Sequence, residues 1–252
     1  MVSFVIPAHN EELLLGRTLD ALREAAKTEG EPYEIVVADD SSSDRTATVA
    51  RDRGARVVEA CYRHIAATRN AGARAAKGER LVFVDADTLV HGALLRAAFE
   101  ALRAGAVGGG CVFQFDGSLP LHAKALMPLI HHTSRAARIA AGCFLFCERR
   151  VFEAVGGFDE SLFGGEEIAF SRALGRMGSF VVLRESVLTS GRKLRAYSGG
   201  EILRLVALLA WRGHEMTRSR EGLDLWYGPR RDDSEADKIT INSQGTANAR
   251  GA

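Results

Sequence analysis

The sequence predicts an α/β fold: a parallel sheet with helices on both faces. Two observations predict it. Short apolar runs alternate with helical patterns four times along the first half of the chain. These runs are continuously apolar, which is typical of strands that helices cover on both faces. With 252 residues, 46% hydrophobic and 26% charged, the chain also has an ordinary globular composition.

In the first half, each predicted strand leads into a predicted helix. The first helix shows the pattern most clearly, because Leu15, Leu19 and Leu22 recur at helical spacing and form one apolar stripe. The predicted strands are 2–6, 35–38, 56–59 and 81–84, and the predicted helices are 13–25, 46–53, 65–76 and 93–104.

The second half is less regular. A Gly-rich stretch over 107–115 is expected to be extended, and 120–140 to be a helix or an ordered loop. Gly178 is a helix stop signal after the predicted helix 166–177. We expect one domain over 1–228, with its halves meeting near 110 and 111, and a disordered polar tail over 229–252. The other predicted elements are strands 143–147 and 180–183, a helix end over 152–159 closed by Gly156-Gly157, and a helix over 201–214.

Composition excludes several classes of protein. A formal net charge of +1 argues against a nucleic-acid binder. Cys143 and Cys147 have no partner Cys/His pair at zinc spacing, so we expect them to be buried thiols in a reducing compartment. No signal peptide pattern opens the sequence, and the apolar run 205–211 is too short to span a bilayer. These features predict a cytoplasmic protein without a transmembrane segment.

Peripheral contact with the inner face of a membrane stays open as an alternative. The predicted helix 201–214, with Trp211 and Trp226 nearby, has the character of a helix that can rest on a membrane surface. The same apolar face fits packing against the core, which is the interpretation that we favour.

Polar residues gather where the predicted strands of the first half end. The first strand leads into Pro7-Ala-His-Asn-Glu11, the second into Asp39-Asp40, and the fourth into Asp85-Ala-Asp87, while Arg69-Asn70 belongs to the third helix. Ligands of open α/β sheets bind outside the carboxyl ends of the strands. Clustered carboxylates repel one another unless a partner compensates them. A hard cation together with a nucleotide is the partner that we expect.

Asp85 and Asp87 are the strongest metal candidates. Residues two apart in an extended segment point the same way, so both carboxylates are expected to reach one ligand. Oxygen ligands suit Mg²⁺ or Mn²⁺, which bridge to substrate phosphates. The alternative is a turn or a helix cap with exposed acids. The position after a buried strand favours the metal site.

Taken together, these segments resemble the family 2 glycosyltransferases. The resemblance implies the GT-A fold, a single domain with a mixed, mainly parallel central sheet flanked by helices. The order and spacing match through the first ninety residues, and a second matching stretch covers 142–178, so the resemblance frames about 1–180. The matching motifs are Pro7-Ala-His-Asn-Glu11, 37–46 with its Asp39-Asp40 pair, 68–72 with Gly78-Glu79, 83–87, Val155-Gly-Gly-Phe-Asp159 and Gly165-Glu-Glu167 with Arg172 and Gly178.

The resemblance implies a role for each of these residues. It implies a nucleotide-sugar-binding half over about 1–110 and an acceptor half over 111–228. Asp85 would contact the ribose side of the nucleotide, and Asp87 would bind Mn²⁺ or Mg²⁺, with Asp85 as a second metal candidate. Arg69 would lie near the ribose or the diphosphate. The residues that would surround the nucleoside base are Pro7, Ala8, Glu11 and Asp39, with Asp40 close by.

Glu166 and Glu167 are the candidate catalytic pair. The family usually has Glu-Asp here, and Glu167 matches the position that supplies the general base, although the longer side chain leaves either glutamate open for the role. A carboxylate suits removal of a proton from an acceptor hydroxyl. One base and no covalent enzyme intermediate predict inversion at the sugar carbon. The structural alternative is a charged first helical turn.

Three further motifs have both a functional and a structural interpretation. We favour a surface or partly buried pair for His131-His132, because adjacent helical residues do not share a face. Arg192-Lys193-Leu-Arg195 is either a clamp for a diphosphate or another anion, or a solvated loop. Gly108-Gly-Gly110 is interpreted as a turn or bulge, because no dinucleotide-binding pattern follows it.

The sequence therefore predicts metal-dependent, inverting transfer from a nucleotide-diphosphate sugar to a carbohydrate, lipid-linked or small-molecule acceptor. The alternative from another class is a catalytically silent nucleotide or glycan binder on the same fold. A sugar-nucleotide nucleotidyltransferase and a nicotinamide dehydrogenase are disfavoured, because Pro7-Ala-His-Asn-Glu11 stands where each has its glycine-rich loop.

Overall fold

The computed structural model describes residues 1–117, 121–196, 200–201, 204, 217–223 and 227–228. Trp211, Trp226, most of the predicted helix 201–214 and the predicted tail 229–252 lie outside the described residues. Within the part that is described, none of the helices has the length and apolar character needed to cross a bilayer.

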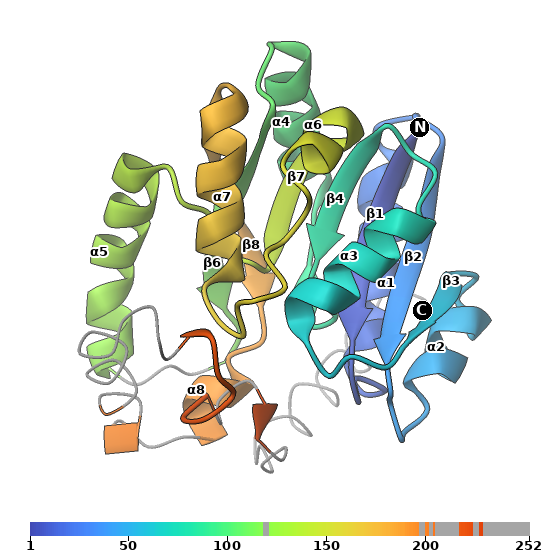
Figure 1. The fold of residues 1–252 in the computed structure, drawn as a ribbon, viewed down its shortest axis with the longest axis vertical. Helices are drawn as coiled ribbons and strands as arrows, with labels where there is room; N and C mark the ends of the chain where they lie inside the picture. Colours follow the sequence, from blue (N-terminus) through green and yellow to red (C-terminus); the bar gives the residue numbers. More distant parts are fainter. Residues whose placement is uncertain (118–120, 197–199, 202–203, 205–216, 224–226, 229–252) are drawn as a thin grey trace, which may run out of the picture.

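Eight strands form one mixed sheet in the order β3-β2-β1-β4-β7-β6-β8-β5 (Figure 1). β3, β2, β1 and β4 are mutually parallel neighbours, β7 is antiparallel to both β4 and β6, and β6 is parallel to β8. The predicted mixed, mainly parallel sheet is confirmed. The strands are β1 (Val2–Ala8), β2 (Tyr33–Asp40), β3 (Arg56–Ala60), β4 (Arg80–Val84), β5 (Thr88–Leu89), β6 (Gly108–Phe115), β7 (Phe144–Glu148) and β8 (Phe180–Thr189).

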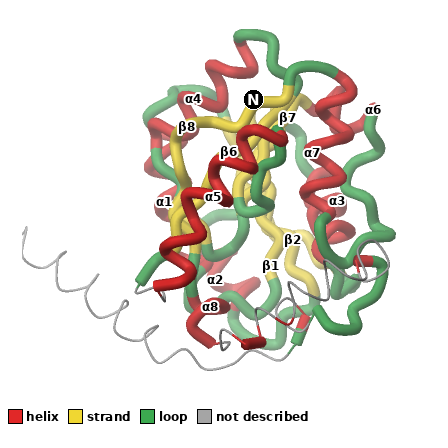
Figure 2. The backbone as a smooth tube through the Cα atoms, turned by 90° about the vertical axis from the view of Figure 1, so that its left-hand side faces the viewer, coloured by secondary structure: helices red, strands yellow, loops and turns green. Residues whose placement is uncertain are grey.

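Helices cover both faces of this sheet. The helices are α1 (Leu15–Lys27), α2 (Thr46–Asp52), α3 (Ile65–Ala75), α4 (Gly92–Arg103), α5 (Leu121–Ala137), α6 (Arg149–Ala154), α7 (Glu166–Met177) and α8 (Arg192–Ala196). In Figure 1, α3, α6 and α7 lie in front of the sheet, and they contribute to one apolar core. α1, α2 and α4 contribute to the second core on the opposite face. Figure 2 shows α5 at the outside of the molecule, where it contacts β6.

The continuously apolar strands supply both cores at once. Along β4, Val82 and Val84 belong to the core that contains α1 and α4, whereas Leu81 and Phe83 belong to the core that contains α3 and α7. Successive side chains of a strand point to opposite faces, so a strand buried on both sides needs apolar residues at every position. This confirms the reason given for the unbroken apolar runs.

The second half differs from the prediction in several elements. β8 continues to Thr189, six residues beyond the predicted strand end, and the two-residue strand β5 pairs with its last residues. The region 120–140 contains the helix α5. The two-residue β5 is too short to produce a periodic signal. The second part of β8 contains polar residues, so the hydrophobic pattern did not predict the full length of this strand.

Gly108-Gly-Gly110 lies inside β6, so its interpretation as a turn or bulge was wrong. The register shift falls immediately afterwards, between Cys111 and Val112. A Cβ atom on Gly109 would lie 2.3 Å from the backbone oxygen of Val181. The glycines therefore allow close packing of β6 between its neighbours.

Burial of the thiols was predicted correctly for Cys143 and Cys147. Both are buried, as is Cys111, and all four cysteines of the chain are free. Burial raises the pKa of Cys111 to about 12 and holds the pKa values of Cys143 and Cys147 far above the usual range. These three thiols are packing residues that stay protonated. Cys61 is exposed.

Candidate functional site

The candidate site lies at the edge of the sheet where β1, β2, β4 and β8 end. The pairing of β4 through β7 and β6 to β8 gives all four strands the same direction, so their carboxyl ends share this edge. Three of the four strand ends were predicted from the sequence. The fourth, Thr189, comes from the unexpected length of β8. It leads directly into the basic segment that begins at Arg192.

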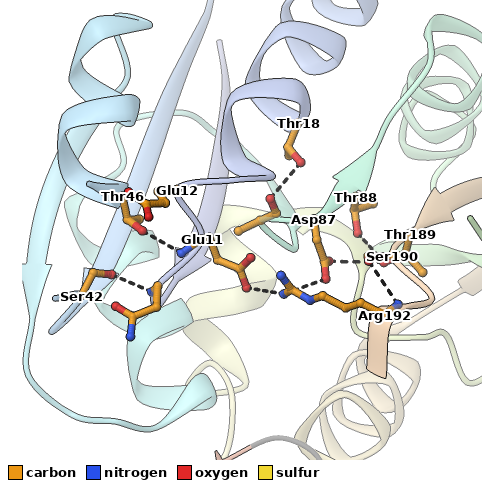
Figure 3. A network of polar contacts seen from close by, with 12 residues as sticks. Glu11, Glu12, Thr18, Ser42, Thr46, Asp87, Thr88, Thr189, Ser190 and Arg192 are labelled. Atoms are coloured by element: carbon orange, nitrogen blue, oxygen red, sulfur yellow. Dashed lines mark hydrogen bonds and ion pairs between the residues drawn. The ribbon is translucent and has the colours of Figure 1, made fainter. Parts of the chain in front are cut away.

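Glu11, Asp87 and Arg192 meet at the centre of this edge (Figure 3). The Arg192 Nη2 atom donates to Glu11 Oε1 at 2.6 Å and to Asp87 Oδ2 at 3.2 Å. The Arg192 side chain is only 18% exposed, and those of Glu11 and Asp87 are 10% and 14% exposed. Burial lowers the pKa of Arg192, but the attraction of Glu11, Asp87 and Asp116 raises it above its usual value. Two acidic residues that follow separate strands therefore share one buried cation.

The segment between Asp85 and Asp87 is a turn, which corrects the prediction that it is extended. The backbone N–H of Thr88 donates to the Asp85 carbonyl oxygen at 3.1 Å, and the Thr18 hydroxyl holds the turn through the Ala86 carbonyl oxygen at 2.9 Å (Figure 3). The two carboxylates consequently contact different arginines. Thr189 donates from Oγ1 to Asp87 Oδ1 at 3.3 Å and so fixes the Asp87 carboxylate beside the end of β8.

Arg69 forms the second charged cluster, under Asp85. Its guanidinium donates to Asp85 Oδ1 at 2.9 Å, to Glu166 Oε1 at 2.7 Å and to the Gly142 carbonyl oxygen at 3.1 Å. The Arg69 side chain is 3% exposed and lies over the ring of Phe158. Burial lowers the pKa of Arg69, but the two carboxylates raise it above its usual value. This arginine joins the end of β4 to the start of α7.

Glu166 and Glu167 begin α7 after Gly165, which adopts φ +73° in the left-handed region that suits glycine. Glu166 is buried and ion-paired with Arg69. Glu167 is half-buried. Burial, reinforced by the neighbouring charge of Glu166, raises the pKa of Glu167 to about 8. The pair therefore divides into a glutamate that is ion-paired with Arg69 and a glutamate whose pKa is raised. The latter property is common among general acids and bases.

Glu167→Gln is expected to change how the free energy of unfolding depends on pH. The folded-state pKa of about 8 lies above the ordinary value of 4.5, so the wild type loses stability as the pH rises from the lower value through the higher one. Glutamine carries no such charge. Urea unfolding measures this difference. Between pH 5 and pH 9, the free energy of unfolding of the variant should rise relative to that of the wild type by on the order of a few kcal/mol.

The matched control for this measurement is Glu153→Gln, which removes a carboxylate whose side chain is 63% exposed. Its difference from the wild type should vary little over the same pH range. A stability difference for Glu167→Gln that is equally independent of pH would contradict the raised pKa.

The two aspartates at the end of β2 differ in their surroundings. The Asp40 carboxylate accepts the backbone N–H groups of Tyr62, Arg63 and His64 at 2.8, 2.8 and 2.9 Å, and the Thr68 hydroxyl at 2.7 Å. Burial raises the pKa of Asp40, but these hydrogen bonds lower it below its usual value. Asp40 therefore holds the loop before α3 in place.

Asp39 is also buried, but its Oδ1 atom has no hydrogen-bond partner among the described residues. Its neighbours on β1 follow from the register, which pairs Pro7 with Ala38 and Ala8 with Asp39. A buried acceptor without a donor loses free energy unless a ligand or water supplies one. Asp39 Oδ1, next to Ala8 in register, is thus a buried acceptor that a hydrogen-bond-donating ligand would satisfy.

Two residues of this site, Arg192 and Thr189, were not among the predicted site residues. Arg192 was considered only within its basic motif, and its burial excludes the solvated-loop alternative. Arg195 beside it donates to Asp116 Oδ1 at 3.1 Å. Thr189 carried no sequence signal, because a threonine at a strand end is ordinary. A small pocket beside Asp87 is lined by Leu14, Arg17, Thr18, Asp87, Leu89, Asp116, Leu188, Thr189 and Ser190.

The histidine pair lies away from these clusters. His131 is half-buried and its Nε2 atom hydrogen-bonds the Phe113 carbonyl oxygen at 2.8 Å, while His132 is exposed. The preferred interpretation as a surface or partly buried pair is confirmed.

Known proteins resemble this chain both in sequence and in fold. Residues 3–155 match the family model described as Glycosyl transferase family 2. The validoxylamine A glucosyltransferase of Streptomyces hygroscopicus subsp. limoneus is 34% identical over 130 residues, which are 48% of this chain and 28% of that protein. The matched segment thus spans under a third of the length of this curated relative.

Solved structures share the fold across nearly the whole chain. The mannosyltransferase PcManGT from Pyrobaculum calidifontis, in complex with GDP-Man and Mn²⁺, has a TM-score of 0.65 at 20% identity and covers 98% of this chain and 80% of its own. TarS 1-349 from S. aureus, in complex with UDP-GlcNAc, has a TM-score of 0.60 at 20% identity, with coverages of 96% and 77%. At this identity the likeness establishes the fold.

Proposed function

Because the chain belongs to glycosyl transferase family 2, we propose that it transfers a sugar from a nucleotide-diphosphate sugar to an acceptor hydroxyl, with inversion at the sugar carbon, in the synthesis of a glycan or glycolipid. One observation carries the proposal. Acidic residues from separate elements lie at one edge of the sheet, where Asp39 ends β2 and Glu11 and Asp87 follow β1 and β4. Glu167 lies in the first turn of α7, next to Glu166, which Arg69 joins to Asp85. This edge is where open α/β sheets bind their ligands.

The donor side of the site is built on β1 and β2. The buried Asp39 Oδ1 atom is available to accept an N–H of the nucleoside base. Pro7 and Ala8 lie next to it in register and would pack along the base. Asp40 contributes by holding the 62–64 segment in place. The nucleoside base would therefore donate a hydrogen bond to one acceptor, which the paired strands β1 and β2 hold in place.

The residues fit a divalent cation at Glu11 and Asp87. Asp85, the other predicted ligand, is instead held by Arg69, so Glu11 replaces it as the second carboxylate in this proposal. Among the described residues no three His, Cys, Asp or Glu form a complete metal-binding group. Phosphate oxygens and water would complete the shell, as is common for Mg²⁺ sites. Bound Mn²⁺ or Mg²⁺ would stabilise the negative charge of the leaving diphosphate.

Glu167 is the proposed general base. Its raised pKa of about 8 makes its ionised form a stronger proton acceptor than an ordinary carboxylate, although most of the groups are protonated at pH 7. Glu166 forms an ion pair with Arg69 at 2.7 Å. This contact favours Glu167, rather than Glu166, as the general base. A base that acts once, on the acceptor hydroxyl, yields a product of inverted configuration. A product that kept the anomeric configuration of the donor would contradict the mechanism.

The proposed function is tested with a panel of UDP-, GDP- and dTDP-sugars, each with Mn²⁺, Mg²⁺ or neither. We expect one donor class to raise the thermal unfolding midpoint in the presence of metal, because a ligand that binds the folded state stabilises it. The same donor should release nucleoside diphosphate when an acceptor is supplied. Binding without release for every donor and acceptor tried would support the silent nucleotide or glycan binder, and binding of no donor would reject both.

A further inference from the structure

Arg192 occupies the position between the two carboxylates proposed for the metal. A single nitrogen, Nη2, contacts both Glu11 Oε1 and Asp87 Oδ2, at 2.6 and 3.2 Å (Figure 3). Glu11 follows β1, Asp87 follows β4 and Arg192 follows β8, so three strand ends meet at this contact. The positive charge of this guanidinium therefore offsets part of the negative charge of the two carboxylates.

Hydrogen bonds between the end of β8 and the start of α8 hold Arg192 in this position. The backbone N–H of Gly191 donates to Asp116 Oδ1 at 2.7 Å, and the backbone N–H of Arg192 donates to the Ser190 hydroxyl at 3.3 Å. A Cβ atom on Gly191 would lie 2.8 Å from the Asp116 carbonyl oxygen. Only glycine fits this approach without movement. The position of Arg192 is therefore fixed by the end of β8 and by Asp116.

Electrostatics sets Arg192 and a divalent cation in competition for the same two carboxylates. A divalent cation needs oxygens of the same two carboxylates, and two cations brought together in a half-buried site repel each other strongly. Arginine cannot relieve the conflict by losing its proton, because its pKa is far above the physiological range. Its guanidinium must move away from the carboxylates, and a phosphate group is a strong alternative partner for it.

We propose that Arg192 is an internal counter-ion that competes with the divalent metal for Glu11 and Asp87, and that a nucleoside diphosphate removes this competition by binding the displaced guanidinium. The inference rests on the proposed function. Free protein then binds metal weakly, and nucleotide and metal strengthen each other's binding. Because such coupling is reciprocal, the metal raises nucleotide affinity by the same factor as the nucleotide raises metal affinity.

The experiment measures Mn²⁺ binding directly, through the electron paramagnetic resonance signal of free Mn²⁺, with and without UDP or GDP. Without nucleotide, Arg192→Gln should bind Mn²⁺ at least about 10-fold more tightly than the wild type, within the usual range of coupling between sites. The factor by which nucleotide improves Mn²⁺ affinity should shrink correspondingly. Adding Asp87→Asn to Arg192→Gln should abolish the gain, because it removes one of the two carboxylates.

The matched control is Arg80→Gln, which breaks a half-buried ion pair with Glu31, 2.6 Å long, that involves no residue of the site. Its Mn²⁺ affinity should equal that of the wild type. Should Arg192→Gln fail to unfold cooperatively, Arg192→Lys replaces it, because a shorter side chain with a single ammonium should hold the two carboxylates less well and give an intermediate gain.

Unchanged or weaker Mn²⁺ binding in the folded Arg192 variant would overturn the inference, as would tight Mn²⁺ binding at this site in the nucleotide-free wild type. Neither result depends on sugar transfer. Failure of the proposed function has a different signature: the wild type releases no nucleoside diphosphate with any nucleotide sugar and acceptor, with or without metal.

Discussion

Glu167→Gln is expected to lower the rate of sugar transfer by about 10²- to 10⁴-fold, the usual contribution of a general base, while donor affinity stays near that of the wild type. Glutamine keeps the size of the side chain but cannot accept the acceptor's proton. The donor residues on β1 and β2 are untouched by this change. Single-turnover transfer rates and the dissociation constant of the donor, measured separately, test the two halves of the prediction.

The control for Glu167→Gln is again Glu153→Gln, on α6 and largely exposed, which should transfer sugar at the wild-type rate. Undiminished transfer by Glu167→Gln would remove Glu167 from the mechanism. If transfer were instead lost in Glu166→Gln with the fold intact, the base would be Glu166, and its ion pair with Arg69 would have to open during the reaction.

Asp87→Ala should abolish the dependence of donor binding on metal. With Mn²⁺ present, we expect donor affinity to fall by at least about 10- to 100-fold, since even residues that only support metal ligands cost that much when they are replaced. Without metal, the wild type and the variant should differ far less. Calorimetric titration of the nucleotide sugar, with and without Mn²⁺, gives both comparisons.

Asp20→Ala is the matched control for Asp87→Ala. It removes an aspartate whose side chain is 61% exposed and pairs with Arg53, and it leaves the oxygens of Glu11 and Asp87 in place. Its donor binding should keep the metal dependence of the wild type. Metal-dependent donor binding that persisted in Asp87→Ala would show that the cation is held elsewhere.

Local pattern was sufficient for the first half of the fold. The run 81–84 is apolar at every position because its alternate residues enter two different cores, and that requirement is visible without the structure. The acidic residues that follow the parallel strands were correctly expected to share one edge, because parallel strands end on the same side of a sheet. Asp87 and Glu11 do meet there, on one arginine nitrogen.

Local pattern failed wherever a residue's role depends on a distant partner. Asp85 and Asp87 look equivalent in the sequence, but a turn separates them and each contacts its own arginine. Glu166 and Glu167 also look equivalent, and it is the position of Arg69 that makes one an ion-paired carboxylate and the other a group of raised pKa.

The amino-acid sequence by itself determined the layered α/β fold, the family resemblance and the acidic strand ends, since these depend on the order of residues and on periods of two and 3.6. Only the tertiary structure decided which charges meet. Arg192 reaches Glu11 across 181 positions of sequence, through a register between β6 and β8 that shifts at Cys111 and Val112. Such a pairing depends on strand order and strand length, neither of which leaves a periodic signal near the residues concerned.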